Sequence, residues 1–370
     1  MKQDHPKTPV PRRLESLDAL RGFDMFWIVG GGAMFMGLDP VFHSSWTRFL
    51  CTQLDHVEWI GFRFWDIIMP LFLFIVGTAI PFSTAKRLAT GQTRGKIVFH
   101  LIRRVVLLWI LGTIAQGNLL SYDLSKLQLY SNTLQAIAAG YLIASFAFLN
   151  LDMKWFAVLL AGLLLAFWAL MAWVPVPGYG AGVLTPDGNL ANYLDRRLLG
   201  PFDDGLDYTW ILSSLNFGST VMLGVIAGRL LQSSRTQEKK ALWLLGLGVA
   251  CTVLGLVWGV WSPVIKKLWT GSFVLFSGGL CFLLLAAFYW IIDVLDHRLW
   301  AFGFKVIGVN AIAVYMATHV FDFRHLGNIF VGGLSDRLGP WNELVQAAAA
   351  FAAVWLILYW MYRKKTFIKI

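Results

Sequence analysis

Long apolar runs separated by short polar segments dominate the chain. A helix needs about 20 apolar residues to cross a hydrocarbon core about 30 Å thick. The pattern therefore predicts an all-α, polytopic integral membrane bundle that forms one domain over residues 17–362. The ten expected spans are residues 17–38, 62–82, 105–120, 132–150, 155–174, 211–231, 241–261, 273–293, 301–320 and 343–362.

Composition and charge support this picture and add an orientation. The chain is 57% hydrophobic and 14% charged, far from the values of soluble globular proteins. Its net charge is +10, but the basic residues cluster in short segments between apolar runs, which indicates membrane topology and no nucleic acid partner. Both termini are predicted to be cytoplasmic tails, at residues 1–16 and 363–370, because most of the 31 Lys and Arg residues then lie inside.

Two predicted outer loops are long, at residues 39–61 and 175–210. Long connections in compact domains are usually functional or disordered. Each of these contains an amphipathic stretch, Val41–Leu54 and Leu190–Leu199, so we expect both to be ordered over the outer mouth of the bundle. The three cysteines lie far apart and no metal-binding motif is present, so neither a disulfide framework nor a metal site is expected.

The first span carries charged residues, which are costly within a membrane. Asp18 and Arg21 are three residues apart on one helical face, so they can form a structural pair near the interface. Asp24 lies deeper and is harder to explain structurally, which makes it a candidate for substrate binding. The run Gly30–Gly32 permits either close helix packing or a break, and packing is the default interpretation.

A second polar cluster begins just before the second span. His56 lies outside that span next to Glu58, and Asp66 lies about one turn inside it. Asp66 needs a partner or a proton there, and His56 can be that partner only if the intervening segment folds back. We expect Pro70 to loosen the helix, since proline removes one backbone hydrogen bond. A histidine near a membrane surface is more often an ordinary interface residue, so both interpretations of His56 stay open.

The ninth span contributes Asn310, near mid-membrane, and His319, near the outer end. Nine residues correspond to about 13–14 Å along a helix. His319 can therefore reach the same outer mouth as His56. Two histidines there favour acid–base chemistry, although a structural hydrogen-bonded pair stays open.

Six motifs follow one another through almost the whole chain: SLDALRGFDMFW, DHVEWIGFRFWDIIMPLFLFIVG, SNTLQAIA, PGYGAGVLTPDGNLANYLDRRLLG, WSPVIKKLWTGSFVLFSGG and GVNAIAVY. The most specific part is the spacing of His56, Trp59, Gly61, Asp66 and Pro70. Together the motifs resemble the heparan-α-glucosaminide N-acetyltransferase family and its bacterial relatives.

The resemblance implies a transmembrane acetyltransferase. Such an enzyme takes acetyl-CoA from the cytoplasmic side and acetylates an amino-sugar or glycan acceptor on the other side. The family's active-site histidine maps onto His56, which would act as general base or transient acetyl carrier. A family asparagine that assists it has no counterpart here, because Gly31 or Gly32 occupies the equivalent place.

This mechanism assigns roles to the remaining polar residues. Asp66 orients the imidazole, and Asn310 or His319 donates to the developing oxyanion. Arginine suits phosphate through bidentate hydrogen bonds, and acidic outer groups attract a cationic amino sugar. The binding candidates are Arg21, Arg103 and Arg104 for acetyl-CoA, and Asp24, Glu58 and Trp59 for the acceptor.

Two other functions fit the same pattern. A helix bundle with intramembrane Asp and His residues suits a proton-coupled sugar or oligosaccharide transporter. A membrane scaffold for cell-envelope assembly would instead tolerate replacement of those residues. The likeness to bacterial relatives implies a multi-pass protein among the lipids of the bacterial inner membrane, and it leaves the acceptor and a homo-oligomeric state open.

Overall fold

The computed structural model describes residues 14–117, 122–205 and 207–368. Within these ranges the chain forms helices and no β-strand. Nine helices of the described part are long and apolar enough to cross a membrane, and one bent helix pair makes up to ten. The predicted all-α, polytopic membrane bundle is confirmed, whereas the placement of both termini in the cytoplasm stays a prediction. Residues 1–13 and 369–370 of the predicted tails lie outside the described residues.

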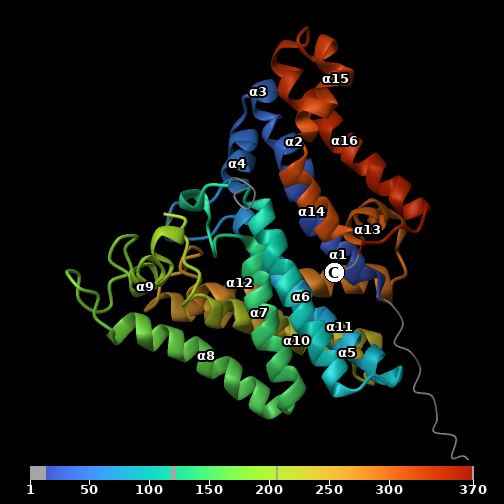
Figure 1. Cartoon of the computed structure of the whole chain (residues 1–370). Coiled ribbons are helices and arrows are strands. Elements are labelled where there is room, and N and C mark those ends of the chain that lie inside the picture. Colours follow the sequence, from blue (N-terminus) through green and yellow to red (C-terminus); the bar gives the residue numbers. More distant parts are fainter. Residues whose placement is uncertain (1–13, 118–121, 206, 369–370) are drawn as a thin grey trace, which may run out of the picture.

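The helices follow one another in an order close to the predicted one (Figure 1). They are α1 (Glu15–Phe26), α2 (Gly32–Met36), α3 (Asp39–Phe42), α4 (Ser45–Gln53), α5 (Ile68–Ala89), α6 (Arg94–Ala115), α7 (Thr133–Asn150), α8 (Met153–Trp173), α9 (Leu190–Leu199), α10 (Ser214–Gln232), α11 (Gln237–Gly259), α12 (Gly271–Tyr289), α13 (Phe302–Gly308), α14 (Ala311–Val320), α15 (Phe323–Ser335) and α16 (Asn342–Arg363).

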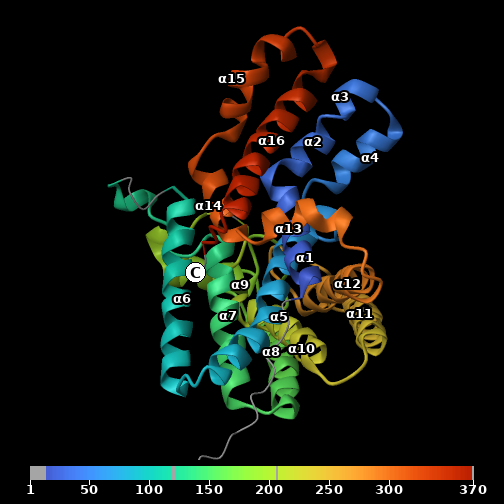
Figure 2. The same cartoon turned by 90° about the vertical axis from the view of Figure 1, so that its right-hand side faces the viewer.

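The centre of the bundle is a close crossing of α5 and α10, and α10 also packs on α7. A Cβ atom on Gly224 would overlap the carbonyl oxygen of Phe74, and one on Gly77 would overlap that of Val221. The two backbones therefore touch, as small residues allow in membrane helices. At one end of the molecule, α15 and α16 lie together beside α2, α3 and α4 (Figures 1 and 2).

Three predicted details are wrong. Helix α6 begins at Arg94 rather than at residue 105, because Thr93 caps it and long basic side chains can extend to the interface from inside a helix. The ninth span is broken, with a bend of 61° between α13 and α14, so Asn310 is the N-cap residue of α14 at the break and does not lie inside one continuous span. Pro70 is the third residue of α5, where its missing N–H removes no helical hydrogen bond.

The glycine run in the first span both packs and breaks the helix. Gly30 has φ +153°, inside a π-helical turn at Trp27–Gly31 that separates α1 from α2. A Cβ on Gly32 would lie 2.7 Å from the ring of Trp65, so the same turn also brings the first span against the next one.

Helices occupy both long loops. Helix α9 coincides with the stretch Leu190–Leu199 that the sequence marked as amphipathic, and α3 and α4 lie in the other loop. The loops meet where Trp59 Nε1 donates to the Leu184 carbonyl at 2.8 Å. Asp195 of α9 is fully buried and accepts hydrogen bonds from the backbone N–H groups of Trp210 (2.6 Å) and Ile211 (2.9 Å). This contact fixes the segment that leads into α10.

Candidate active site

His56 and Asp66 form a direct pair. The His56 Nδ1 atom lies 2.8 Å from Asp66 Oδ1, and Asp66 is fully buried. Asp66 also accepts a hydrogen bond from the backbone N–H of Arg63 at 2.9 Å. Because a carboxylate only accepts, Nδ1 carries a proton toward Asp66 and leaves the second ring nitrogen, Nε2, for chemistry. The segment between the two residues thus folds back, as their pairing required.

The loop that carries His56 is held on several sides. Arg63 donates from its guanidinium to the His56 carbonyl at 2.9 Å, and Asp55 accepts from the His56 backbone N–H at 2.8 Å. Gly61, at φ +124°, donates its N–H to the carbonyl of Val264 at 2.9 Å. That φ favours glycine, and the bond joins the histidine loop to the segment before α12.

Lys266 completes the cluster and is the residue that the sequence analysis missed. Its Nζ lies 3.2 Å from Asp66 Oδ1 and 3.1 Å from His56 Nδ1, and its side chain is only 6% exposed. Burial lowers the pKa of Lys266 to about 8, against the opposing pull of Asp66. In the sequence, Lys266 is one of two adjacent lysines in a predicted loop, where a lysine is usually exposed to solvent. The signal that could have found it is the apolar flank, Ile265 and Leu268, both of which are fully buried.

The cluster opens into a cavity of about 380 Å³, here called the histidine cavity. His319 lines it as well, so the two histidines share one cavity. Its Nδ1 donates to the Tyr315 carbonyl at 2.8 Å, which leaves Nε2 of the neutral ring as a hydrogen-bond acceptor. An acceptor suits an ammonium or hydroxyl group better than an oxyanion. Other lining residues are Trp65, Met69, Phe72, Asn132, Tyr208 and Trp210.

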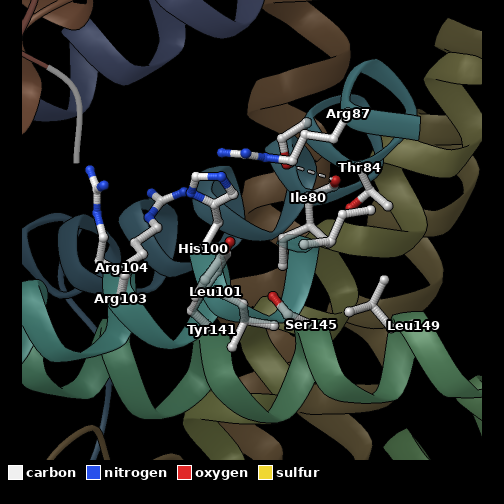
Figure 3. Close-up of a pocket in the computed structure, with 12 residues that line it drawn as sticks. Ile80, Thr84, Arg87, His100, Leu101, Arg103, Arg104, Tyr141, Ser145 and Leu149 are labelled. Carbon is white, nitrogen blue, oxygen red and sulfur yellow. Dashed lines mark hydrogen bonds between the residues drawn. The ribbon is translucent and has the colours of Figure 1, made fainter. Parts of the chain in front are cut away.

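A basic pocket, here called the arginine pocket, lies on α5, α6 and α7 (Figure 3). The Arg104 guanidinium lies 4.6 Å from the centre of the Tyr141 ring, and the buried hydroxyl of Ser145 has no hydrogen-bond partner among the described residues. Such groups suit an anionic ligand with polar oxygens. Four nitrogen-bearing side chains gather around the pocket: Arg87, His100, Arg103 and Arg104.

The histidine cavity and the arginine pocket lie along the same two helices. On α5, Phe72 lines the cavity and Ile80 the pocket, a separation of about 12 Å along the helix. On α7, Ile137 lines the cavity and Tyr141 the pocket, a separation of about 6 Å. The two sites therefore lie about 6–12 Å apart along one pair of helices.

A third cavity, here called the side groove, has a volume of about 700 Å³ and runs from the π-helical turn after α1 to α16. It shares Ile28 and His319 with the histidine cavity. Its charged lining residues are Asp322, Arg324 and Glu343. The groove therefore adjoins the histidine cavity at Ile28 and His319.

Three predicted site residues lie away from these cavities. The Asn310 amide donates to the Thr366 carbonyl at 3.2 Å and accepts from the Ile368 N–H at 3.0 Å, so it holds the C-terminal segment, and its position does not support an oxyanion role. Asp24 is fully buried within α1 and lines none of the three cavities. Arg21 lies 3.6 Å from Asp18, as expected of a structural pair.

The two acceptor candidates in the histidine loop also lie outside the cavity. Glu58 is exposed, and Trp59 is used in the contact between the two long loops. Trp59 therefore stabilises the loop that carries His56, in place of the direct substrate contact expected of it.

Comparison with known proteins agrees with the motifs. A family model described as a domain of unknown function (DUF5009) matches residues 13–180. Heparan-α-glucosaminide N-acetyltransferase from Homo sapiens is 27% identical over 98% of this chain, and the Mus musculus protein is 27% identical over 97%. The chain spans 60% of the length of each. The resemblance is thereby confirmed: the chain is similar to the heparan-α-glucosaminide N-acetyltransferases along nearly all of its own length.

Proposed function

We propose that this chain is a membrane acetyltransferase, which moves the acetyl group of acetyl-CoA to the amine of an amino sugar or a related acceptor. One observation carries the proposal: His56, paired with the fully buried Asp66, faces a cavity, and a basic pocket lies farther along the same two helices. The two mammalian relatives are named for N-acetyl transfer to a heparan glucosaminide.

The arginine pocket would bind the phosphates of acetyl-CoA. Arg103 and Arg104 were the predicted donors, and Arg87 joins them from α5. Guanidinium groups bind phosphate oxygens in a bidentate manner, and the free hydroxyl of Ser145 offers a further donor. The pantetheine arm would then extend along α5 and α7 and deliver the thioester to His56.

The reaction would take place at Nε2 of His56. In direct transfer, the acceptor nitrogen attacks the thioester carbonyl and forms the amide bond, Nε2 takes the amine proton, and the carbon–sulfur bond breaks. CoA leaves as a thiolate and takes up the proton from the imidazolium, which Asp66 stabilises meanwhile. In the alternative route Nε2 itself attacks, releases CoA and passes the acetyl group to the amine from an acetyl-imidazole.

The acceptor would enter through the side groove and meet His319. The neutral His319 ring presents Nε2 as an acceptor for a sugar hydroxyl or an ammonium hydrogen. Asp322 and Glu343 farther along the groove would attract a cationic amino sugar. His319 is therefore proposed as a substrate-binding residue.

The test is acetyl transfer by the purified chain from acetyl-labelled acetyl-CoA to glucosamine. The substitution His56→Ala should lower the rate by about 10²-fold or more, the usual contribution of a general base. His325→Ala, on an exposed part of α15, is the matched control and should leave the rate unchanged. Label on His56 without acceptor supports the acetyl-imidazole route. Full activity of His56→Ala would exclude both routes.

The broken span favours a second candidate, the proton-coupled carrier. Discontinuous helices such as α13 and α14 form substrate sites in many transporters. Vesicles separate the two functions: net uptake of amino sugar without acetyl-CoA supports a carrier, whereas acetylation without net uptake supports the enzyme.

A further inference from the structure

The geometry points to Lys266 as a positioning residue of the transfer site. The positive charge of Lys266 offsets the negative charge of Asp66, and so keeps the His56 ring unprotonated at Nε2 until the acceptor arrives. Its importance for acetyl transfer rests on the proposed function. Its control over the charge of His56 does not, and can be measured separately.

The three groups touch one another. Lys266 Nζ lies 3.2 Å from Asp66 Oδ1 and 3.1 Å from the same ring nitrogen of His56 that contacts Asp66. Asp66 is fully buried and the Lys266 side chain nearly so, where charges interact more strongly than in water. A buried carboxylate alone favours the protonated imidazolium. The Lys266 ammonium group, at a similar distance, disfavours the imidazolium form.

This balance matters because an imidazolium cannot act as a base or as a nucleophile. With Asp66 alone, His56 would tend to hold a proton before the reaction began. With Lys266 present, Nε2 of His56 takes up a proton only when the acceptor amine supplies it. Asp66 still fixes the ring orientation through Nδ1.

Lys266 is held by its own segment. The fully buried Ile265 and Leu268 anchor the chain on either side. The next residue, Lys267, has a different environment: its side chain is 22% exposed and pairs with Asp207 at 3.2 Å. Lys267 is therefore a matched control, one position away and of the same charge.

The other ionisable groups around the cluster are engaged elsewhere or uncharged near neutral pH. Asp55 and Arg63 pair with each other at 3.6 Å, as Lys267 and Asp207 do at 3.2 Å. Burial raises the pKa of Tyr208 to about 12, so it stays neutral. The groups that face the cluster are Asp55, Arg63, Tyr208, Tyr315 and His319, whereas the ammonium group of Lys267 lies over the Tyr208 ring.

The first experiment measures the charge of His56 without using catalysis. Diethyl pyrocarbonate modifies unprotonated imidazole, and mass spectrometry gives the extent of modification at His56 as a function of pH. Lys266→Met should displace the pH range of modification upward by about one unit or more, and Asp66→Asn should displace it downward. Lys267→Met should match the wild type.

The double variant Asp66→Asn, Lys266→Met keeps the test valid if either single variant fails to fold. It contains no unpaired buried charge, and it should return close to the wild-type range because both opposing charges are gone. If Lys266→Met and Lys267→Met both match the wild type, Lys266 has no such role. If only Lys266→Met fails to fold, a double variant displaced downward as far as Asp66→Asn contradicts the proposal, because the loss of Lys266 then changes nothing.

The second experiment tests the consequence for transfer. Lys266→Met should lower kcat by about 10–100-fold, as loss of a supporting partner does elsewhere, and shift the acidic limb of the pH–rate profile upward while KM for acetyl-CoA stays similar. Lys266→Arg keeps the charge and should recover part of the rate. A wild-type protein without transfer activity would contradict the proposed function, and the modification experiment would still decide the role of Lys266.

Discussion

The two histidines that line the histidine cavity both use Nδ1 for a hydrogen bond, but the bonding partner differs. His56 directs Nδ1 to the carboxylate of Asp66, and His319 directs Nδ1 to the carbonyl of Tyr315. Both rings therefore present Nε2. A carboxylate stabilises the imidazolium that forms during proton transfer, whereas a neutral carbonyl does so far less. This difference supports the proposed roles, general base for His56 and substrate binding for His319.

The substitution His319→Gln should therefore affect binding more than turnover. We expect KM for the acceptor to rise by about 10-fold, the cost of one hydrogen bond, with kcat close to wild type. Steady-state kinetics with glucosamine as the varied substrate measures both. A fall in kcat as large as that of His56→Ala would show instead that His319 takes part in the chemistry.

Arg104→Met should weaken acetyl-CoA binding. A hydrogen bond to a charged group contributes about 1.5–3 kcal/mol, so KM for acetyl-CoA should rise by about 10–100-fold. The control is Lys96→Met, on an exposed part of the same helix and outside the pocket. Equal KM values for the two variants would place the phosphates elsewhere.

From sequence, His56 and Asp66 could be paired only on the condition that the segment between them folds back. That condition depends on contacts distant in the chain, such as the hydrogen bond from Gly61 to Val264. Lys266 could not be paired with Asp66 from sequence, since 200 positions separate them. Asn310 was misjudged because nothing local indicated that the C-terminal segment returns to it.

At the level of helices, the α5–α10 crossing supports the site, because α5 lines both the histidine cavity and the arginine pocket. We expect Gly224→Val to lower stability by about 2 kcal/mol or more, since a side chain must push the two backbones apart. Gly246→Val is the control, because a Cβ there meets nothing within 4 Å. Thermal unfolding in detergent gives the difference, and equal midpoints would contradict the crossing.

The contact of α9 with the segment before α10 should depend on pH. Burial raises the pKa of Asp195 to about 6, above the value of about 3.9 for a free aspartate. Between these values the folded state binds more protons than the unfolded state, so this group's contribution is fully present below about pH 4 and is lost as pH rises through about 6. The difference in thermal midpoint between wild type and Asp195→Ala should shrink over that range. A difference in thermal midpoint that stays constant with pH would contradict this role of Asp195.

Most spans were predictable because apolar length alone defines a membrane helix. The exceptions have local causes. The start of α6 was hidden because Arg103 and Arg104 lie within a helix, at positions that looked like a loop. The break after Gly308 was missed because the apolar run continues across it, although Gly308, Val309 and Asn310 are weak helix formers, and the fold shows a bend of 61° there.

At the scale of the whole molecule, the proposed donor and acceptor sites are built from different elements. The arginine pocket lies along α5 and α7 from the cavity, and the side groove leaves the cavity past His319. Combined with the predicted cytoplasmic termini, this arrangement favours donor entry from the cytoplasm and acceptor entry from the other side.

The most direct test of this account uses proteoliposomes that contain acetyl-labelled acetyl-CoA inside and glucosamine outside. We predict that labelled N-acetylglucosamine accumulates outside while intact acetyl-CoA stays inside, and that His56→Ala vesicles form essentially none. Equal product from His56→Ala vesicles, or product only when both substrates share one compartment, would contradict transfer across the membrane at this histidine.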